Sequence, residues 1–311
     1  MLHYLERDGN LAIRDEFDFF AGVSTGAMVA AYLANNAGSV EVLALNEYSS
    51  ARLTQSYFDK SIWDKLLDRF QNQPKYDGRR KRARIETLLG GVFINDIKDK
   101  HLLILAYDFI NRELVTFKNN STHDATYNQL LAEICDAATA APTIYPTIPT
   151  TAPKRRRLVD GALATNDPSH CAISEALAMG HALEEIWMVS LGTGKPTHDL
   201  SQKDRDRIGM ASRDWGILGW IRNDLFDHMM TPSSAVSPRQ CQQLLGARYL
   251  RIDGKLPRKL MQVDNTTEVR VEDLRSYALL WLEQFAEQVE QLLAGVHEAR
   301  TLHAGATLPD I

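Results

Sequence analysis

A serine that could act as a nucleophile stands between two glycines at residues 22–26, which read Gly-Val-Ser-Thr-Gly. An apolar segment precedes this pattern and a helix-forming run follows it, so the expected order is strand, sharp turn, helix. Such a turn exposes the Ser24 hydroxyl, and the N-terminus of the next helix directs free N–H groups toward developing negative charge. We expect Gly22 and Gly26 to be required because side chains there would keep the strand and the helix apart.

A nucleophilic serine needs a base that removes its hydroxyl proton. The best candidate is Asp160, which stands where a short apolar strand ends and is followed by small residues. Ligand and substrate sites of open α/β sheets lie at such strand ends. The alternative is that Asp160 only caps a turn. Asp167 precedes a proline and is therefore expected to cap a helix.

A histidine base is the rival interpretation, because the chain holds nine histidines. In α/β-hydrolases the triad follows the order serine, acid, histidine. His170, His181, His198 and His228 all follow Asp160 in the sequence. None of them stands in a glycine-rich turn or at a strand end, so no residue is singled out as the third member of a triad.

Four other segments could be taken for sites. Residues 190–196 lack two features of a phosphate-binding loop, an early glycine and a hydroxyl residue after the lysine, so we expect a tight turn at the end of a strand. The basic runs at 79–84 and 154–157 either attract anionic lipid headgroups or form a solvated helix start and a solvated loop. The apolar cluster at 215–221 either borders an acyl-chain pocket or packs in the core.

The composition of the 311-residue chain is that of a globular enzyme, with 44% hydrophobic residues and a net charge of −5. This charge gives no general case for binding a nucleic acid polymer. Three dispersed cysteines, Cys135, Cys171 and Cys241, favour a reducing compartment or core packing. No apolar run approaches the roughly 18 residues of a spanning helix, so we expect a cytoplasmic protein with peripheral membrane contact left open. No residue set has metal-ligand spacing, and we expect neither a metal nor a cofactor.

Strands and helices alternate along the chain, which predicts a three-layer α/β fold with a mainly parallel central sheet flanked by helices. We expect a single domain over residues 1–311, with a core over about 10–255 and a C-terminal helical segment over about 268–300. The expected strands are 17–21, 101–107, 113–118, 157–161, 185–191 and 248–252, and the expected helices include 1–9, 25–36, much of 39–70, 126–137, 168–179 and 270–300. Residues 140–153 are expected to form an irregular loop.

With these motifs in place, the chain resembles the patatin-like phospholipases, and in particular their bacterial branch. Residues 22–27 are similar to the G-x-S-x-G elbow of that family, and residues 160–162 are similar to its D-G-[GA] motif. The resemblance extends over about residues 10–290 and includes further similar stretches at 74–78, 137–146, 166–168, 189–194 and 249–253.

The resemblance implies a lipid acyl hydrolase, of phospholipase A or lysophospholipase type, with a Ser-Asp dyad and no cofactor. Ser24 is then the nucleophile that forms an acyl-serine intermediate, and Asp160 is the base. The N–H of Thr25 contributes to the oxyanion hole, while Gly22, Gly26 and Gly161 support the two motifs. The implied substrate is a phospholipid or another acyl ester. Some bacterial relatives are switched on by cyclic nucleotides, for which these residues give no support.

The family pattern begins with a strand and a glycine-rich loop whose N–H groups form the oxyanion hole. In this sequence Met1 falls inside the helix that follows this loop, so Thr25 is the one recognisable donor, and we expect weakened turnover. Two alternatives therefore stay beside the dyad hydrolase. One is a weak or inactive patatin-fold protein that binds lipid or another ligand, and the other is a Ser-His-Asp esterase.

Overall fold

The computed structural model describes residues 12–35, 74–119, 128–150, 155–197, 201–211, 225–261 and 266–305, together with the isolated positions 2 and 6. Several predicted features fall outside the described residues: most of the helix at 1–9, the helical stretch at 39–70, the apolar cluster at 215–221 and His198.

The described strands form one larger sheet and two short pairs. A five-stranded sheet places β1, β2, β5 and β4 in that order, with β3 also paired to β2. Parallel pairing joins β1 to β2, β6 to β8 and β7 to β9, whereas β2–β3, β2–β5 and β4–β5 are antiparallel. The strand bounds are β1 Phe19–Val23, β2 His101–Asp108, β3 Glu113–Lys118, β4 Ile148–Thr150, β5 Arg156–Asp160, β6 Met188–Leu191, β7 Lys195–Pro196, β8 Tyr249–Ile252 and β9 Lys255–Leu256.

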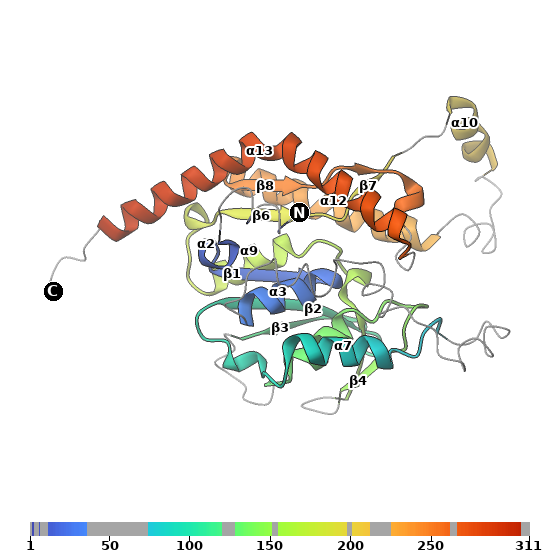
Figure 1. Ribbon diagram of the computed structural model, residues 1–311, viewed down its shortest axis with the longest axis horizontal. Helices are drawn as coiled ribbons and strands as arrows, with labels where there is room; N and C mark the ends of the chain where they lie inside the picture. The colour runs from blue at the N-terminus through green and yellow to red at the C-terminus, as the bar shows by residue number, and fades with distance from the viewer. Residues whose placement is uncertain are drawn as a thin grey trace.

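Helices cover both faces of the larger sheet, as the expected α/β architecture requires (Figure 1). Helices α3, α7 and α8 contribute to the core cluster on one face, and α9 contributes to the cluster on the other. Beyond α9, helices α12 and α13 contact β8, and α13 extends along the β6–β8 pair (Figure 1). The helix bounds are α2 Ile13–Glu16, α3 Thr25–Asn35, α7 Arg79–Leu89, α8 Leu131–Ala138, α9 Ser169–Ala178, α10 Gln202–Ala211, α12 Leu225–Leu245 and α13 Glu268–Gly305.

Strand β2 is the centre of the core. Its residues 102–106 are apolar without interruption and all are buried. Such a run is typical of a strand that is covered on both faces. Leu102 and Ile104 belong to the core cluster with α3 and α8, while Leu103 and Leu105 belong to the cluster with α9. This alternation follows from the two-residue period of a strand.

The predicted elements agree with the structure to within a few residues in most described places, including β3 and the long C-terminal helix α13. The predicted loop at 140–153 contains β4, which pairs with β5. The loop prediction missed β4 because this strand is defined by its pairing with β5, and a local sequence pattern does not specify such pairing. All three cysteines are free. Within the described helices, none is both long and apolar enough to cross a bilayer.

Candidate active site

The turn between β1 and α3 holds Ser24 in a left-handed backbone conformation. Its φ angle is 54°, a region that residues with a side chain seldom occupy. The carbonyl of Ser24 accepts a hydrogen bond of 2.9 Å from the N–H of Ala27, which starts the helix at once. Ser24 is partly exposed and Thr25 is exposed, so the elbow opens toward solvent. Strain of this kind is concentrated at functional sites.

The two glycines of the elbow have different roles. A Cβ added to Gly22 would lie 2.2 Å from the carbonyl oxygen of Gly26, so strand and helix touch only because Gly22 has no side chain. The expectation that Gly26 is required for the same reason is wrong. A Cβ at Gly26 meets no atom of the described residues within 4 Å, and the residue is exposed. Gly26 therefore leaves open space beside Ser24.

Strands β1 and β5 meet end to end along one edge of β2, with Asp160 at the meeting point. Both must lie on this edge because β3 occupies the other edge along residues 103–108. Strand β1 stops where Val23 pairs with Leu105, and β5 stops where Asp160 pairs with Ala106. The two strands run in opposite directions, so each delivers its last residue to the same place. The site is thus a junction of two converging strands rather than an edge of parallel strand ends.

The side chains of Ser24 and Asp160 are in direct contact at this junction. The Ser24 hydroxyl donates a hydrogen bond of 2.6 Å to Oδ2 of Asp160, and the N–H of Ala162 donates one of 2.9 Å to Oδ1. Asp160 also caps the short 3-10 helix Gly161–Leu163, so the turn-capping alternative holds alongside the contact with Ser24. Gly161 permits this approach, because a Cβ there would lie 2.4 Å from the carbonyl oxygen of Leu105.

The environment of Asp160 makes its carboxylate more basic than usual. Burial raises the pKa of Asp160, because only 4% of the residue is exposed. The hydrogen bonds from Ser24 and Ala162 and the charge of Lys81 lower this pKa, but they do not outweigh burial. A carboxylate with a raised pKa that accepts a hydrogen bond from a hydroxyl is suited to remove the hydroxyl proton.

A buried lysine, Lys81, lies near Asp160, and the sequence analysis did not identify it. Lys81 is 3% exposed and forms an ion pair of 2.8 Å with the carboxylate of Asp136. Its ammonium group also donates to the Asp136 carbonyl at 2.6 Å and to the Thr139 hydroxyl at 3.0 Å. The carbonyl of the next residue, Ala140, accepts the N–H of Asp160 at 3.0 Å. The cluster around Lys81 therefore connects to the backbone that carries Asp160.

Both interpretations of the basic run at 79–84, lipid attraction and a solvated helix start, are wrong for Lys81. The buried residues of α7 are Lys81, Ile85 and Leu89, which are spaced by four and share one helix face. The spacing was visible in the sequence and placed Lys81 on the apolar stripe. Its partner was equally visible, since Asp136 lies in a helix whose other residues, Glu133 apart, are buried and uncharged. Burial lowers the pKa of Lys81, and the charge of Asp136 opposes that change.

The described histidines of the triad alternative make contacts elsewhere. His170 is exposed, and its backbone N–H lies 3.4 Å from the Ser237 hydroxyl. His181 is exposed and lies 3.9 Å from Glu185. His228 belongs to α12, but its side chain is outside the described part of the structure. The Ser24 hydroxyl itself donates directly to Asp160, with no ring between them.

Asp167 stands one residue before the N-cap of α9, which is Pro168 rather than Asp167 as expected, but its side chain still binds the first helical N–H and has a second partner. Its Oδ1 accepts the N–H of Ser169 at 2.8 Å, where α9 begins. Its Oδ2 forms an ion pair of 2.8 Å with Arg251, which also binds Asp253 at 3.2 Å. Asp253 in turn accepts the N–H of Gly194 at 3.0 Å. The turn after β6 is therefore held by β8 and its extension.

Thr25 is the first residue of α3, so its N–H has no acceptor within the helix. The partial positive charge of the helix N-terminus lies at the same position. An oxygen that develops negative charge next to Ser24 would meet this end of α3. This places the predicted oxyanion donor beside the hydroxyl that contacts Asp160.

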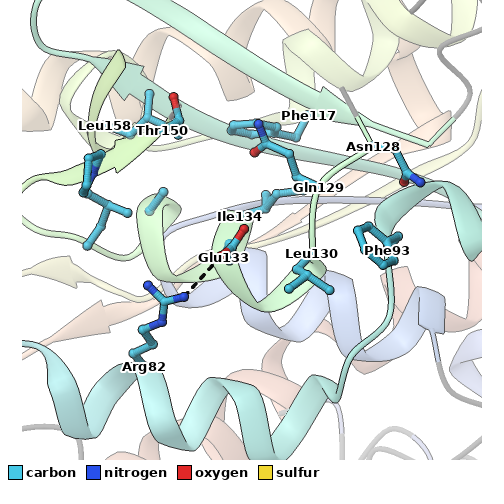
Figure 2. A pocket seen from close by; sticks show the side chains of 13 residues that line it. Arg82, Phe93, Phe117, Asn128, Gln129, Leu130, Glu133, Ile134, Thr150 and Leu158 are labelled. Atoms are coloured by element: carbon cyan, nitrogen blue, oxygen red, sulfur yellow. Dashed lines mark hydrogen bonds and ion pairs between the residues drawn. The ribbon is translucent and has the colours of Figure 1, made fainter. Parts of the chain in front are cut away.

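A separate pocket of about 290 Å³ lies between α7, α8, β4 and β5 (Figure 2). Arg82 and Glu133 form an ion pair of 3.2 Å among its lining residues, which also include Phe93, Phe117 and Leu158. Neither Ser24 nor Asp160 lines this pocket, and we assign it no part in the chemistry. Among the described residues, no group of three His, Cys, Asp or Glu side chains could hold a metal ion.

Comparison with known proteins finds patatins and patatin-like proteins among the relatives of this chain. The chain is 26% identical to patatin-like protein 3 of Arabidopsis thaliana, across 86% of this chain and 72% of that protein. It is 28% identical to patatin-like protein 2 of Oryza sativa subsp. indica, across 67% of this chain and 57% of that protein. It is 25% identical to patatin group A-2 of Solanum tuberosum, across 71% of this chain and 60% of that protein. Alignment with the latter two therefore spans less than two thirds of their length.

A solved structure, VipD from Legionella pneumophila, aligns with 91% of this chain and 64% of its own at a TM-score of 0.38 and 11% identity. The sequence pattern that defines the patatin-like phospholipases matches residues 1–173, which include the elbow and the converging strands that carry Ser24 and Asp160. This match covers more than half of the 311 residues. The chain therefore belongs to the patatin-like phospholipase family.

Proposed function

We propose that this protein hydrolyses the carboxylic esters of phospholipids through a dyad of Ser24 and Asp160. The observation that carries the proposal is the 2.6 Å hydrogen bond from the Ser24 hydroxyl to the buried Asp160 carboxylate. Membership of the patatin-like phospholipase family supports a lipid ester as the substrate class. Thr25 and Gly26 beside Ser24 are exposed, so an ester could reach the elbow from solvent.

The reaction begins when Asp160 takes the hydroxyl proton and Ser24 Oγ attacks the ester carbonyl carbon. The carbonyl oxygen of the tetrahedral intermediate carries a negative charge, which the Thr25 N–H and the N-terminus of α3 stabilise. When the intermediate collapses, the bond to the alcohol oxygen breaks and Asp160 returns its proton to this leaving group. The fatty acyl group then remains on Ser24.

Water completes the cycle. Asp160, ionised again, takes a proton from a water molecule that attacks the acyl carbonyl. The second tetrahedral intermediate releases the free fatty acid, and the proton on Asp160 passes to Ser24 Oγ. The direct contact between Ser24 and Asp160 favours this dyad over the Ser-His-Asp alternative, in which an imidazole would have to stand between the two side chains.

The test is release of fatty acid from phosphatidylcholine in mixed micelles by the full chain. We expect turnover by the wild type and none by Ser24→Ala. Ser174→Ala is the matched control, because Ser174 is an exposed serine of α9 outside the site, and it should retain wild-type turnover. Circular dichroism verifies that each variant is folded. Fatty acid release by folded Ser24→Ala at the wild-type rate would overturn the proposal.

A further inference from the structure

The turn between β2 and β3 exposes two large apolar side chains. Phe109 is 58% exposed and Ile110 is 61% exposed, and they are neighbours at the tip of the hairpin. Leu114, at the start of β3, is a further partly exposed apolar residue at 37%. Scattered single apolar residues on a surface are ordinary, so the adjacent exposed pair Phe109 and Ile110 is the feature that a binding role would explain.

The hairpin tip is held rigidly in this exposed state. The carboxylate of Asp108, which is fully buried, accepts the N–H of Ile110 at 2.9 Å and the side-chain amide of Asn111 at 2.7 Å. The N–H of Phe109 donates to the carbonyl of Arg157 at 2.8 Å. The turn is therefore built to present Phe109 and Ile110, and little ordering is required when they bind a partner.

Positive charge surrounds this tip because β5 begins beside it. The register places Asp108 opposite Leu158, so the basic run that precedes Leu158 lies next to Phe109 and Ile110. Arg112 on the turn, Arg155 directly before β5 and Arg157 within β5 are exposed. Of the carboxylates beside the tip, Asp108 is buried and Glu113 has a side chain that is 48% exposed, and they lie 3.6 and 3.5 Å from the mostly buried side chain of Arg156. The three exposed arginines outnumber the one exposed carboxylate, so the net exposed charge of these residues is positive.

The tip also has a definite position relative to Ser24 and Asp160. Val23, which precedes Ser24, pairs with Leu105 of β2, and Asp160 pairs with Ala106. Phe109 and Ile110 come directly after the end of β2, farther along the direction of this strand. At about 3.3 Å per residue, the tip lies roughly 10–16 Å farther along the sheet. Apolar side chains within a basic border are typical of proteins that insert shallowly into an anionic lipid surface.

We propose that the β2–β3 turn, with Phe109 and Ile110 inserted among the lipids and Arg112, Arg155 and Arg157 against the headgroups, docks this protein on anionic phospholipid membranes. The proposal extends the proposed function, since a docked tip holds the dyad next to a lipid substrate. Its occupant is a bilayer surface with negative charge. Arg155 and Arg157 of the basic run at 154–157, which the dyad leaves without a role, acquire one here.

The experiment measures binding to phosphatidylcholine vesicles with and without phosphatidylglycerol by flotation. Every protein carries Ser24→Ala, so the vesicles stay intact and the result does not depend on hydrolysis. We expect binding to the anionic vesicles, weakened by salt because exposed charges are screened. Phe109→Ser with Ile110→Ser should weaken it at least about tenfold. Arg112→Gln with Arg155→Gln and Arg157→Gln should weaken it about 10²-fold, since each basic residue near an anionic surface contributes roughly fivefold.

Matched controls remove the same groups elsewhere. Leu177→Ser with Val269→Ser changes two exposed apolar residues, at 44% and 74% exposure. Lys98→Gln with Lys255→Gln and Lys259→Gln removes three exposed cations and gives the same net charge as the arginine variant. Both controls should bind as the parent does. Loss of affinity in the controls equal to that in the hairpin variants, or no binding of the parent to anionic vesicles, would overturn the proposal.

Failure of the dyad and failure of the docking turn give different results. If the dyad assignment fails, phospholipid hydrolysis is independent of Ser24 while vesicle binding still depends on the hairpin. If the docking proposal fails, hydrolysis remains dependent on Ser24 and the hairpin variants bind vesicles as well as their controls. In the presence of wild-type Ser24, the hairpin variants should hydrolyse a soluble p-nitrophenyl ester at the wild-type rate and anionic vesicles more slowly.

Discussion

The elbow around Ser24 and the charged cluster around Lys81 both reach Asp160, but they are built in opposite ways. The elbow is local: the end of β1, Ser24 and the start of α3 follow one another directly in the sequence, and the turn opens to solvent. The cluster is assembled from α7 and α8, which are about 55 residues apart in the chain, and it is fully buried. The elbow presents the Ser24 hydroxyl. The cluster connects to the backbone of Asp160, and the charge of its Lys81 lowers the pKa of the Asp160 carboxylate.

The two regions also differ in the kind of unfavourable free energy that each contains. The elbow stores strain in the left-handed backbone of Ser24. The cluster instead removes an ammonium group and a carboxylate from water, a cost that their mutual attraction and hydrogen bonds must offset. Changes to the reacting side chains at the elbow should therefore affect chemistry more than stability, while changes in the cluster should affect stability first.

Asp160→Asn gives the largest effect we expect, because Asp160 belongs to both regions. The asparagine retains an acceptor for the Ala162 N–H but cannot take the Ser24 proton. Turnover of a p-nitrophenyl ester should fall by about 10²–10⁴-fold, while the thermal unfolding midpoint stays close to that of the wild type. Steady-state kinetics and calorimetry measure the two quantities.

His170→Ala and His181→Ala serve as controls for this measurement, since both residues are described and neither contacts Ser24 in the structure. Each should keep most of the activity. A histidine variant that stays folded and loses as much activity as Asp160→Asn would support the triad and remove the functional contrast between elbow and cluster.

Lys81→Met tests the buried cluster. The change leaves the Asp136 carboxylate buried without its cation, which typically destabilises a protein by about 3–5 kcal/mol. Adding Asp136→Leu removes the remaining charge and should restore much of the loss. Arg80→Met, at an exposed position of the same basic run, should change stability by no more than about 0.5 kcal/mol. Urea unfolding gives all three values, and equal stability of Lys81→Met and Arg80→Met would contradict the role of the cluster.

The two elbow glycines give the smallest effects, with opposite signs. Gly22→Ala places a Cβ 2.2 Å from a backbone oxygen, and overpacking of this kind costs about 1–3 kcal/mol. Gly26→Ala meets open space and should be neutral or stabilise the protein by up to about 1 kcal/mol, since alanine favours a helix. Thermal unfolding distinguishes them. Equal destabilisation by both changes would mean that Gly26 has the same packing role as Gly22.

Much of the fold could be predicted from the sequence because most of its elements are encoded locally. The apolar run of β2, the elbow and the helix pattern of α13 are each readable within a short window. The pairing of β4 with β5 and of β7 with β9 could not be predicted in this way. Strands β4, β7 and β9 have only two or three residues each, and their pairing partners rather than their own sequence patterns define them.

In the candidate site, too, the residues that stand in local motifs could be predicted, and those that depend on packing could not. Ser24 and Asp160 could be proposed because each stands in a recognisable local motif, although their contact depends on the end-to-end arrangement of β1 and β5. Lys81 was missed because a lysine in a run of arginines resembles a solvated surface. Its position four residues before Ile85 was the signal that placed it on the buried face of α7. The role of Gly26 was misjudged because the motif does not show which glycine touches the backbone.

The most direct test of the Ser24–Asp160 dyad is the rate at which a fluorophosphonate labels Ser24 as a function of pH. Asp160 acts as a base only when ionised, and burial raises its pKa. The rate should therefore be high above a single midpoint, fall as pH decreases through it, and show that midpoint above the ordinary value for aspartate of about 3.9. Mass spectrometry should place the adduct on Ser24, and Asp160→Asn should label slowly at every pH without the inflection. An adduct on another residue, or the same inflection in Asp160→Asn, would contradict the dyad.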